Sequence, residues 1–285
     1  MLTTLREVLG PARENGYAVP GFDCSEDVMV RAILETAEEL RTPVAIMCLE
    51  CELQGNGWHY IPGLVRAVAD RHDIPIVLHL DHATDLEMIR RAVDAGFSSV
   101  MIDGSSLPFE ENVRLTKAAA DLAKPHGLSV EGELGHVGGA DLEAIGRCDS
   151  VLTEADEVLA FVEQTGVDAL AVSIGTAHGM YDAEPVLNIK RLRELNAISP
   201  VPLVLHGGSG TPDDQIRDAI RNGICKLNIF ADCRIAMARG LKRSAESLGR
   251  PDPLPHQLFG AIKAEVARVA AEKINLFGSA GRAVP

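Results

Sequence analysis

Eight short segments rich in β-branched residues recur along the chain, and this repetition limits the possible folds more than any other feature. Each segment is apolar almost throughout and is bounded by Gly, Pro or Asp, as expected for parallel strands that are covered on both faces. The segments span residues 17–22, 43–49, 74–80, 98–102, 128–133, 169–174, 202–206 and 224–229. A doubly wound sheet usually stops at five or six strands, so eight strands favour a (β/α)8 barrel.

Segments with the apolar spacing of an amphipathic helix lie between these predicted strands. They span residues 28–40, 64–72, 86–95, 109–126, 155–164, 189–195 and 211–222, and a further amphipathic helix is predicted from His256 to near Phe277. No low-complexity linker or exact internal repeat interrupts the alternation. We therefore predict an α/β protein with one domain, residues 1–285, folded as a single-domain (β/α)8 TIM barrel.

Composition excludes several classes of protein. Of 285 residues, 46% are hydrophobic and 24% are charged, which fits a globular chain with a substantial core. The net charge of -14 would repel a phosphate backbone, so we expect no nucleic-acid partner. No apolar run approaches the ~18 residues of a membrane span, and residues 1–16 carry charges where a signal peptide is apolar. We expect a cytoplasmic protein with no membrane partner.

The six cysteines are few for this length and show no framework spacing, so reduced thiols are expected. Cys48 and Cys51 form a local C-x-x-C pattern. A redox or zinc role would need a thioredoxin-like context or a second cysteine pair, and neither is present. We interpret both as buried small residues at the end of a strand.

Polar residues gather where the predicted strands end. In a (β/α)8 barrel the loops after the C-terminal ends of the strands carry the chemistry, so these side chains are expected to share one rim. They are Asp23, Asp81, His82, Asp103, Glu133, His178, His206 and Asn228. Three histidines from three strands fit a catalytic Zn²⁺, which takes three protein ligands and leaves one position open. His82, His178 and His206 are therefore the predicted metal ligands.

The other histidines that we weighed are assigned no ligand role. His79 shares a side of its strand with Asp81 and is expected to pack in the barrel core. Four more lie in predicted helices or loops away from the rim and are expected to be structural or solvated; these are His59, His72, His126 and His256.

Loops rich in glycine and hydroxyl residues follow the last predicted strands. They are HGGSGT at 206–211, NIFAD at 228–232 and GTAHG at 175–179. Glycines let backbone N–H groups approach phosphate oxygens, and barrels commonly bind phosphate at the loops after strands seven and eight. Beside a candidate metal ligand, these loops predict a site for phosphate or another oxyanion.

Five motifs together resemble a known family, the class II, zinc-dependent fructose-bisphosphate and tagatose-bisphosphate aldolases. They are HLDH at 79–82, VMIDGS at 100–105, EGELG at 131–135, GTAHG at 175–179 and LHGGSG at 205–210. The resemblance extends to the tail FGSAGR at 277–282. It implies a lyase that reversibly cleaves the C3–C4 bond of a ketose phosphate to dihydroxyacetone phosphate and an aldehyde, in a pathway of carbohydrate metabolism such as glycolysis.

The resemblance also implies a role for each site residue. His82, His178 and His206 would hold the zinc, Asp103 and Glu133 would line a second metal position, and Asp81 would be the acid and base at the C4 hydroxyl. The remaining implied residues bind the substrate or its phosphate, and they are Asp23, Gly179, Gly207, Gly208, Ser209, Asn228, Ile229, Phe230 and Ala231. Asn228 begins the loop that closes over the enediolate and also counts as catalytic. A monovalent cation, Na⁺ or K⁺, is implied near Gly179 and Gly207, and a homodimer or homotetramer is implied as the assembly.

The chain departs from the family pattern where substrate is expected to bind. Asp23 stands where the family usually has Asn, and Phe230 and Ala231 replace a small or acidic residue and a Thr. The end of the second strand reads MCLEC at 47–51 instead of a stretch rich in Ser, Thr and Gly. A mobile loop usually carries a Glu that shuttles the C3 proton, and here Asp141 is the expected equivalent, with Glu143 nearby.

Other functions stay open. The protein could be an aldolase that acts on a different or non-bisphosphorylated carbonyl substrate, and two further alternatives are not aldolases. One is a barrel metallohydrolase, which would usually carry a His-x-His pair where this chain has only Asp23. The other is a non-catalytic homologue, suggested by the changes at Asp23, Phe230 and Ala231.

Overall fold

The computed structural model describes residues 2–139, 150–179, 184–250 and 252–283. Eight parallel strands form a closed barrel, and a ninth short strand lies outside it. The strands are β1 (Leu2–Thr3), β2 (Val19–Asp23), β3 (Val44–Leu49), β4 (Ile76–Ala83), β5 (Ser99–Ile102), β6 (Ser129–Leu134), β7 (Ala169–Val172), β8 (Leu203–Leu205) and β9 (Ile224–Ile229). The predicted (β/α)8 barrel is confirmed, and each predicted strand matches one of β2 to β9.

Closure of the barrel depends on two pairings. β2 pairs with β9, and β4 pairs with β5, so the ring of β2 to β9 has no free edge. β1 extends the sheet at the base of β4, where Leu2 and Thr3 pair with Ile76 and Val77. Because all eight strands run parallel, their carboxyl ends meet at one rim of the barrel.

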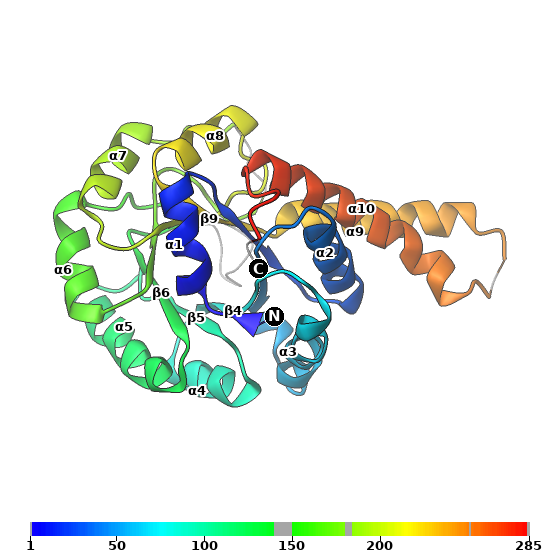
Figure 1. Cartoon of the computed structure of the whole chain (residues 1–285), viewed down its shortest axis with the longest axis horizontal. Helices are drawn as coiled ribbons and strands as arrows, with labels where there is room; N and C mark the ends of the chain where they lie inside the picture. The colour runs from blue at the N-terminus through cyan, green and yellow to red at the C-terminus, as the bar shows by residue number, and fades with distance from the viewer. Residues whose placement is uncertain (1, 140–149, 180–183, 251, 284–285) are drawn as a thin grey trace.

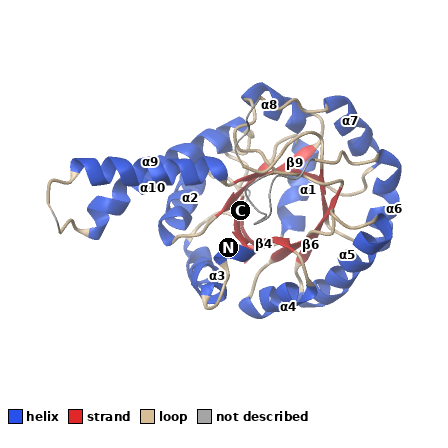
Figure 2. Ribbon diagram, turned by 180° about the vertical axis from the view of Figure 1, so that it is seen from behind, coloured by secondary structure: helices blue, strands red, loops and turns tan. Residues whose placement is uncertain are grey.

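Helices surround the barrel as an outer layer (Figure 2). In the described residues they are α1 (Leu5–Asn15), α2 (Asp27–Glu39), α3 (Gly57–Val68), α4 (Leu86–Ala95), α5 (Phe109–Ala123), α6 (Ala155–Thr165), α7 (Ile189–Ile198), α8 (Asp213–Arg221), α9 (Ala231–Ser247) and α10 (Pro255–Leu276). Short 3-10 turns follow at η1 (Glu50–Glu52), η2 (Ala69–Arg71) and η3 (Lys124–His126). None of the described helices is both long enough and apolar enough to cross a membrane.

Helix α1 closes one end of the barrel, and our sequence analysis did not predict it (Figure 1). Its buried face joins apolar side chains from inside the barrel, including Val19, Val77 and Val204, in one cluster. The signal was present in the sequence. Thr4 and Glu7 form a capping box at its start, and Gly16 ends the helix in a left-handed conformation.

Helices α9 and α10 form an arm that projects from the barrel (Figures 1 and 2). The two helices pack along each other, and α10 also packs against α2. Their close approach requires Gly240, because a Cβ at this position would overlap the backbone of Ile262. The first turn of α9 directly follows β9, so one end of the arm lies at the rim where the strands end.

Two predicted details are wrong. The helix expected to begin at residue 64 begins at Gly57, and Pro62 lies inside it. Cys48 is buried as expected, but Cys51 is exposed in the turn that follows β3. Both thiols are free.

Candidate active site

The rim formed by the carboxyl ends of the strands contains two adjoining cavities. We call the first the inner pocket, of about 370 Å³, lined by Asp23, Asp81, His82, His178, Gly179, Gly207, Ser209, Asn228, Phe230 and Ala231. The second is the outer hollow, of about 1060 Å³ and open to solvent, lined by Leu49, Glu50, Cys51, Gln54, His82, Thr84, Asp103, His136, Val137, Gly138, Gly139 and His178. His82 and His178 belong to both, so the two cavities meet at these rings.

A bulge at the end of β4 brings Asp81 and His82 to the same cavity. The register with β5 shifts between Leu80 and Ala83, and His82 has a φ of 48°, which is rare outside glycine. In a regular strand neighbouring side chains point to opposite faces, so these two would be separated. The bulge lets both line the inner pocket. Backbone strain of this kind persists where the surrounding fold enforces it, often at functional sites.

Three histidine rings converge at the junction of the two cavities. The ring of His82 lies 4.9 Å from that of His178 and 4.6 Å from that of His206, measured between centroids. One nitrogen from each ring lies within 4.8 Å of the other two. A second set with the same spacing consists of His82, Asp103 and Glu133. The structure therefore brings together all five residues predicted to contact metal.

Unsatisfied buried atoms fit a divalent metal ion at this point. His178 Nε2, His206 Nδ1 and Glu133 Oε2 are all buried and form no hydrogen bond. His206 Nδ1 and Glu133 Oε2 lie 3.3 Å apart without hydrogen-bond geometry. Buried polar atoms normally have a partner, and this cluster of orphaned nitrogen and oxygen atoms has the composition of a cation site. Imidazole and carboxylate groups are the donors that Zn²⁺ accepts in catalytic sites.

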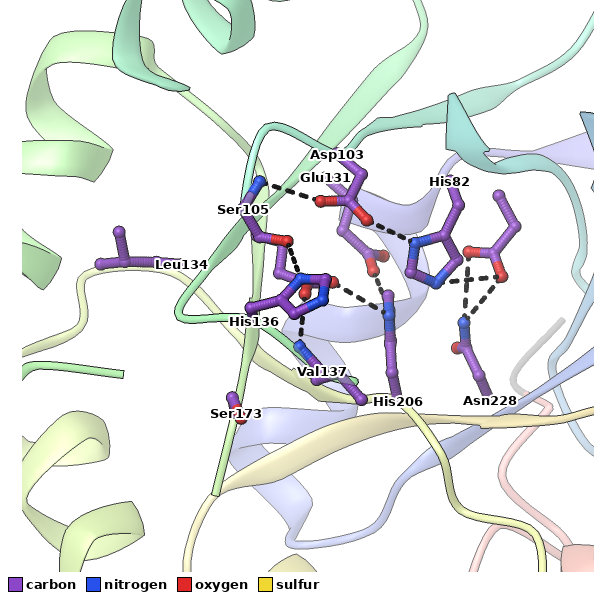
Figure 3. Close-up of polar contacts among 12 residues, drawn as sticks. His82, Asp103, Ser105, Glu131, Leu134, His136, Val137, Ser173, His206 and Asn228 are labelled. Carbon is purple, nitrogen blue, oxygen red and sulfur yellow. Dashed lines mark hydrogen bonds and ion pairs between the residues drawn. The ribbon is translucent and has the colours of Figure 1, made fainter. Parts of the chain in front are cut away.

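Glu131 and Lys226 fix the orientation of His206, and sequence analysis missed both residues. Glu131 Oε1 lies 2.9 Å from His206 Nε2 (Figure 3). The Lys226 ammonium lies 3.0 Å from Glu131 Oε2. All three side chains are fully buried. When Nε2 carries the hydrogen bonded to Glu131, Nδ1 remains as the ligating atom. A lysine inside the apolar strand β9 was the available signal.

A second chain of contacts holds His82. Asp103 Oδ2 lies 2.9 Å from His82 Nδ1, and Asp103 Oδ1 accepts a hydrogen bond from the Ser105 amide (Figure 3). The Ser105 hydroxyl is bonded to His136 Nδ1 at 2.9 Å. His136 therefore belongs to the site, although no predicted strand ends at this residue. His79 is buried and bonded to Ser99, and its Nε2 lies 3.7 Å from Asp81 Oδ1 and 3.8 Å from Glu131 Oε2, so it also borders the site.

The three candidate metal-ligand histidines have shifted pKa values. Burial alone would lower the pKa of His82, but the carboxylates of Asp81 and Asp103 outweigh it and raise this pKa to about 9. Burial also opposes charge on His206, yet Glu131 and Glu133 raise the pKa of His206 to about 10. The pKa of His178 lies well below its usual range because of burial and the two neighbouring rings.

Asp81 is held as a carboxylate beside the rings. Burial would raise the pKa of Asp81, but His82 and other cationic neighbours hold it well below its usual range. The Asn228 amide donates to both Asp81 oxygens, at 3.2 and 3.1 Å. A buried, ionised carboxylate next to a metal position can accept a proton from a bound hydroxyl. Asn228 fixes the plane in which Asp81 does so.

The pKa of Asp23 is shifted in the opposite direction from that of Asp81. Asp23 is buried in the inner pocket, its Oδ1 has no hydrogen-bond partner, and burial together with the nearby Asp81 raises the pKa of Asp23 well above its usual range. A carboxyl group held neutral can donate a hydrogen bond where a carboxylate would only accept one. The raised pKa of Asp23 therefore favours a hydrogen-bond donor over a negative charge at this wall of the pocket.

The opposite wall of the inner pocket is suited to an oxyanion. The Ser209 hydroxyl accepts hydrogen bonds from the amides of Phe230 and Asp232, at the start of α9. The helix dipole and free amides of a first turn favour negative charge. Gly207 has a φ of 66°, and a Cβ there would overlap the Ala177 carbonyl, so only glycine allows this close approach.

Most of the predicted substrate residues line the inner pocket. They are Asp23, Gly179, Gly207, Ser209, Asn228, Phe230 and Ala231. Gly208 and Ile229 lie behind its wall, because the Gly208 amide donates to the Asn228 carbonyl and the Ile229 side chain packs in the apolar core. Asp141, the predicted proton shuttle, and Glu143 lie outside the described residues.

The whole chain matches one protein family. It belongs to the family described as "Fructose-bisphosphate aldolase class-II", whose model matches residues 3–282. The protein is therefore a lyase of the class II aldolase type, a class that is generally metal-dependent. This membership favours the aldolase over the barrel metallohydrolase.

Solved structures agree with this assignment. The YdjI aldolase from Escherichia coli K12 is 34% identical over 100% of both chains, with a TM-score of 0.89. A putative fructose-1,6-biphosphate aldolase from Coccidioides immitis is 27% identical over 98% of both chains, with a TM-score of 0.90. The fructose-bisphosphate aldolase from Campylobacter jejuni shares the fold at 20% identity, covering 98% of this chain and 96% of that one, with a TM-score of 0.83.

Proposed function

We propose that this protein is a zinc-dependent aldolase that reversibly cleaves the C3–C4 bond of a ketose phosphate to dihydroxyacetone phosphate and an aldehyde. The observation that carries the proposal is the convergence of three histidines with the ionised, amide-held Asp81 in one pocket. Fructose 1,6-bisphosphate, tagatose 1,6-bisphosphate and related sugars fit the reaction, which requires only a C2 ketone and a C4 hydroxyl.

His82, His178 and His206 would hold the zinc, and Asp103 and Glu133 would offer it a second position. A bound zinc ion would supply Lewis-acid stabilisation of the negative charge that develops on the C2 oxygen. Glu131 and Asp103 each fix one ligand ring through a hydrogen bond, so two of the three rings are oriented before metal binds.

The phosphate of the dihydroxyacetone phosphate half would bind at the start of α9. Gly207 and Ser209 line this wall and offer a close backbone approach and a hydroxyl, and the start of α9 supplies the positive end of its helix dipole. A monovalent cation, Na⁺ or K⁺, beside Gly179 and Gly207 is part of the proposal. Phosphate held here orients C2 and C3 toward the histidine rings.

Asp81 would remove the proton of the C4 hydroxyl. The C4 oxygen then forms the aldehyde carbonyl, the C3–C4 bond breaks, and its electron pair moves to C2 as an enediolate. Protonation at C3 completes dihydroxyacetone phosphate, and Asp141 is the proposed donor. A positioned base of this kind typically contributes about 10² to 10⁴ in rate. Asn228 keeps Asp81 in place, and neutral Asp23 can donate to an oxygen of the substrate.

The test is a coupled assay for dihydroxyacetone phosphate released from a panel of ketose mono- and bisphosphates, with and without a chelator. We expect release that stops with the chelator and returns with Zn²⁺. Release that survives complete metal removal would contradict the metal-dependent reaction, and silence across the panel in zinc-loaded protein would contradict the substrate class.

We also propose a cytoplasmic homodimer or homotetramer that acts on a small molecule rather than on nucleic acid or a membrane. The projecting arm supports self-association because it exposes apolar side chains, at Leu241, Leu254 and Phe259. Light scattering coupled to size-exclusion chromatography tests the assembly. A monomer at micromolar concentration would contradict it.

A further inference from the structure

The outer hollow differs in chemistry from the inner pocket, although both meet at His82 and His178. In the inner pocket, the helix dipole at the first turn of α9 favours an anion. The outer hollow is lined instead by the carboxylates of Glu50 and Asp103 and by the polar side chains of Cys51, Gln54, Thr84 and His136. Among the described residues that line it, none is Lys or Arg.

Backbone amides of the outer hollow are already used. The glycine-containing stretch after β6 resembles a phosphate loop in composition, but the His136 amide donates to Val151, the Val137 amide to Glu133 and the Gly138 amide to the Ser150 hydroxyl. These three N–H groups therefore cannot form a phosphate nest without losing their partners. The segment serves the structure of the rim.

Two side chains of the hollow, Glu50 and Gln54, are exposed. Glu50 begins the turn after β3, and Gln54 follows that turn. No ion pair or side-chain hydrogen bond joins either of them to another residue that the structure describes. A carboxylate accepts from hydroxyl groups and an amide both donates and accepts, whereas a phosphate group would be repelled by the carboxylate.

We propose that the aldehyde half of the substrate is an unphosphorylated polyhydroxyl chain that lies in the outer hollow against Glu50 and Gln54. This inference rests on the proposed function. The substrate would then be a ketose 1-phosphate. Its single phosphate lies at the start of α9, its C2 and C3 oxygens face the histidine rings, and its hydroxylated end extends past them. In this arrangement the phosphate binds in the inner pocket, and the uncharged hydroxyl groups bind in the outer hollow.

The inference is tested in the direction of synthesis with zinc-loaded enzyme and dihydroxyacetone phosphate. Matched aldehydes are offered with and without a terminal phosphate, as glyceraldehyde against glyceraldehyde 3-phosphate and erythrose against erythrose 4-phosphate. We expect kcat/KM at least about tenfold higher for the unphosphorylated member of each pair, because like-charge juxtaposition is costly. An equal or higher value for the phosphorylated member would overturn the inference.

A second readout separates this inference from the proposed function. Exchange of the hydroxymethyl protons of dihydroxyacetone phosphate with D₂O, without any aldehyde, reports enolisation alone. Exchange together with preference for phosphorylated aldehydes, or with no consumption of any aldehyde, overturns the inference and leaves the enolising site intact. Absence of both exchange and condensation overturns the proposed function itself.

Charge reversal provides a matched test within the chain. Glu50→Lys should raise kcat/KM for glyceraldehyde 3-phosphate relative to glyceraldehyde by about tenfold, chiefly through KM. Glu50→Gln should raise KM for glyceraldehyde with little change in kcat. The control is Glu163→Lys, the same charge change at an exposed position of α6, which should leave the ratio unchanged. An unchanged ratio in Glu50→Lys would overturn the assignment of Glu50.

Discussion

Glu131 Oε1 is 2.9 Å from His206 Nε2 inside the barrel. Glu131 lies on strand β6, whereas His206 directly follows strand β8, 75 residues later in the sequence. The carboxylate decides which ring nitrogen is left to face the cavity. Lys226 compensates its charge from the other side, so the orientation of one candidate metal ligand depends on an ion pair beneath it. Several predictions can be built on this network and its surroundings.

Replacing Glu131 with Gln should weaken zinc binding by about 10- to 100-fold, as loss of a partner that orients a metal-bound histidine typically does. The amide can present either its oxygen or its NH₂ group to Nε2, so it no longer selects one tautomer. Competition with a chromogenic chelator measures the affinity. Glu163→Gln on the outer surface is the control, and an unchanged zinc affinity in Glu131→Gln would contradict the positioning role.

Replacing Lys226 with Met should destabilise the protein by up to about 3–5 kcal/mol, because it removes one of the two cationic partners of the buried Glu131 carboxylate and leaves it only His206. Urea unfolding of the metal-free protein gives the free energy. The double variant Glu131→Gln with Lys226→Met should recover part of the loss, since it leaves no uncompensated buried charge. Strictly additive losses would show that the pair is not coupled.

Replacing Asp81 with Ala should abolish bond cleavage while zinc remains bound. Asp81 lies beside the rings and does not belong to either set of candidate ligands. We expect kcat to fall by about 10² to 10⁴, the range for loss of a general base. Metal content and turnover are measured on the same preparation. Full activity in this variant would refute the role of Asp81, and loss of zinc would show that Asp81 supports the metal instead.

The left-handed backbone at His82 predicts an unusual order of stability. His82→Gly should be more stable than His82→Ala by about 1 kcal/mol, because φ of 48° is costly for any residue with a Cβ. At a regular strand position the order would be reversed. Thermal or urea unfolding of the two metal-free variants distinguishes these cases, and both variants should lose tight zinc binding.

Zinc binding should release protons at neutral pH. The pKa values of His82 and His206, about 9 and about 10, mean that both rings are protonated in metal-free protein below pH 9. Zinc requires neutral imidazole, so apparent affinity should fall as pH falls and level off above about pH 10. Titration calorimetry in buffers of different ionisation enthalpy measures the release. Heats that do not depend on the buffer would contradict the raised pKa values.

The sequence was sufficient to predict the eight barrel strands because burial on both faces leaves a continuous apolar run. It also predicted the convergence of His82, His178 and His206, since parallel strands place their carboxyl ends together. The bulge at the end of β4 was not predictable. The predicted strand at 74–80 ends before the bulge, and no sequence pattern indicates that a histidine adopts a positive φ. Residues 1–16 were considered only as a possible signal peptide, so the capping box of α1 was missed.

The parts of the site that could not be predicted from the sequence depend on contacts between residues far apart in the chain. Lys226 is anomalous in an apolar strand until Glu131, 95 residues earlier, is placed opposite it. Gly208 and Ile229 belong to the right loops, but their orientation depends on the hydrogen bond between the Gly208 amide and the Asn228 carbonyl. A motif identifies a loop, whereas only the folded chain decides which of its residues face the cavity.

Helix α9 joins the inner pocket to the far end of the projecting arm (Figure 1). Its first turn is capped by Ser209, and its 17 residues extend about 25 Å outward. Because the helix begins at the wall of the inner pocket, a tilt of about 5° at Phe230 would displace Ser247 by about 2 Å. Packing of α9 along α10, and of α10 on α2, opposes such a tilt.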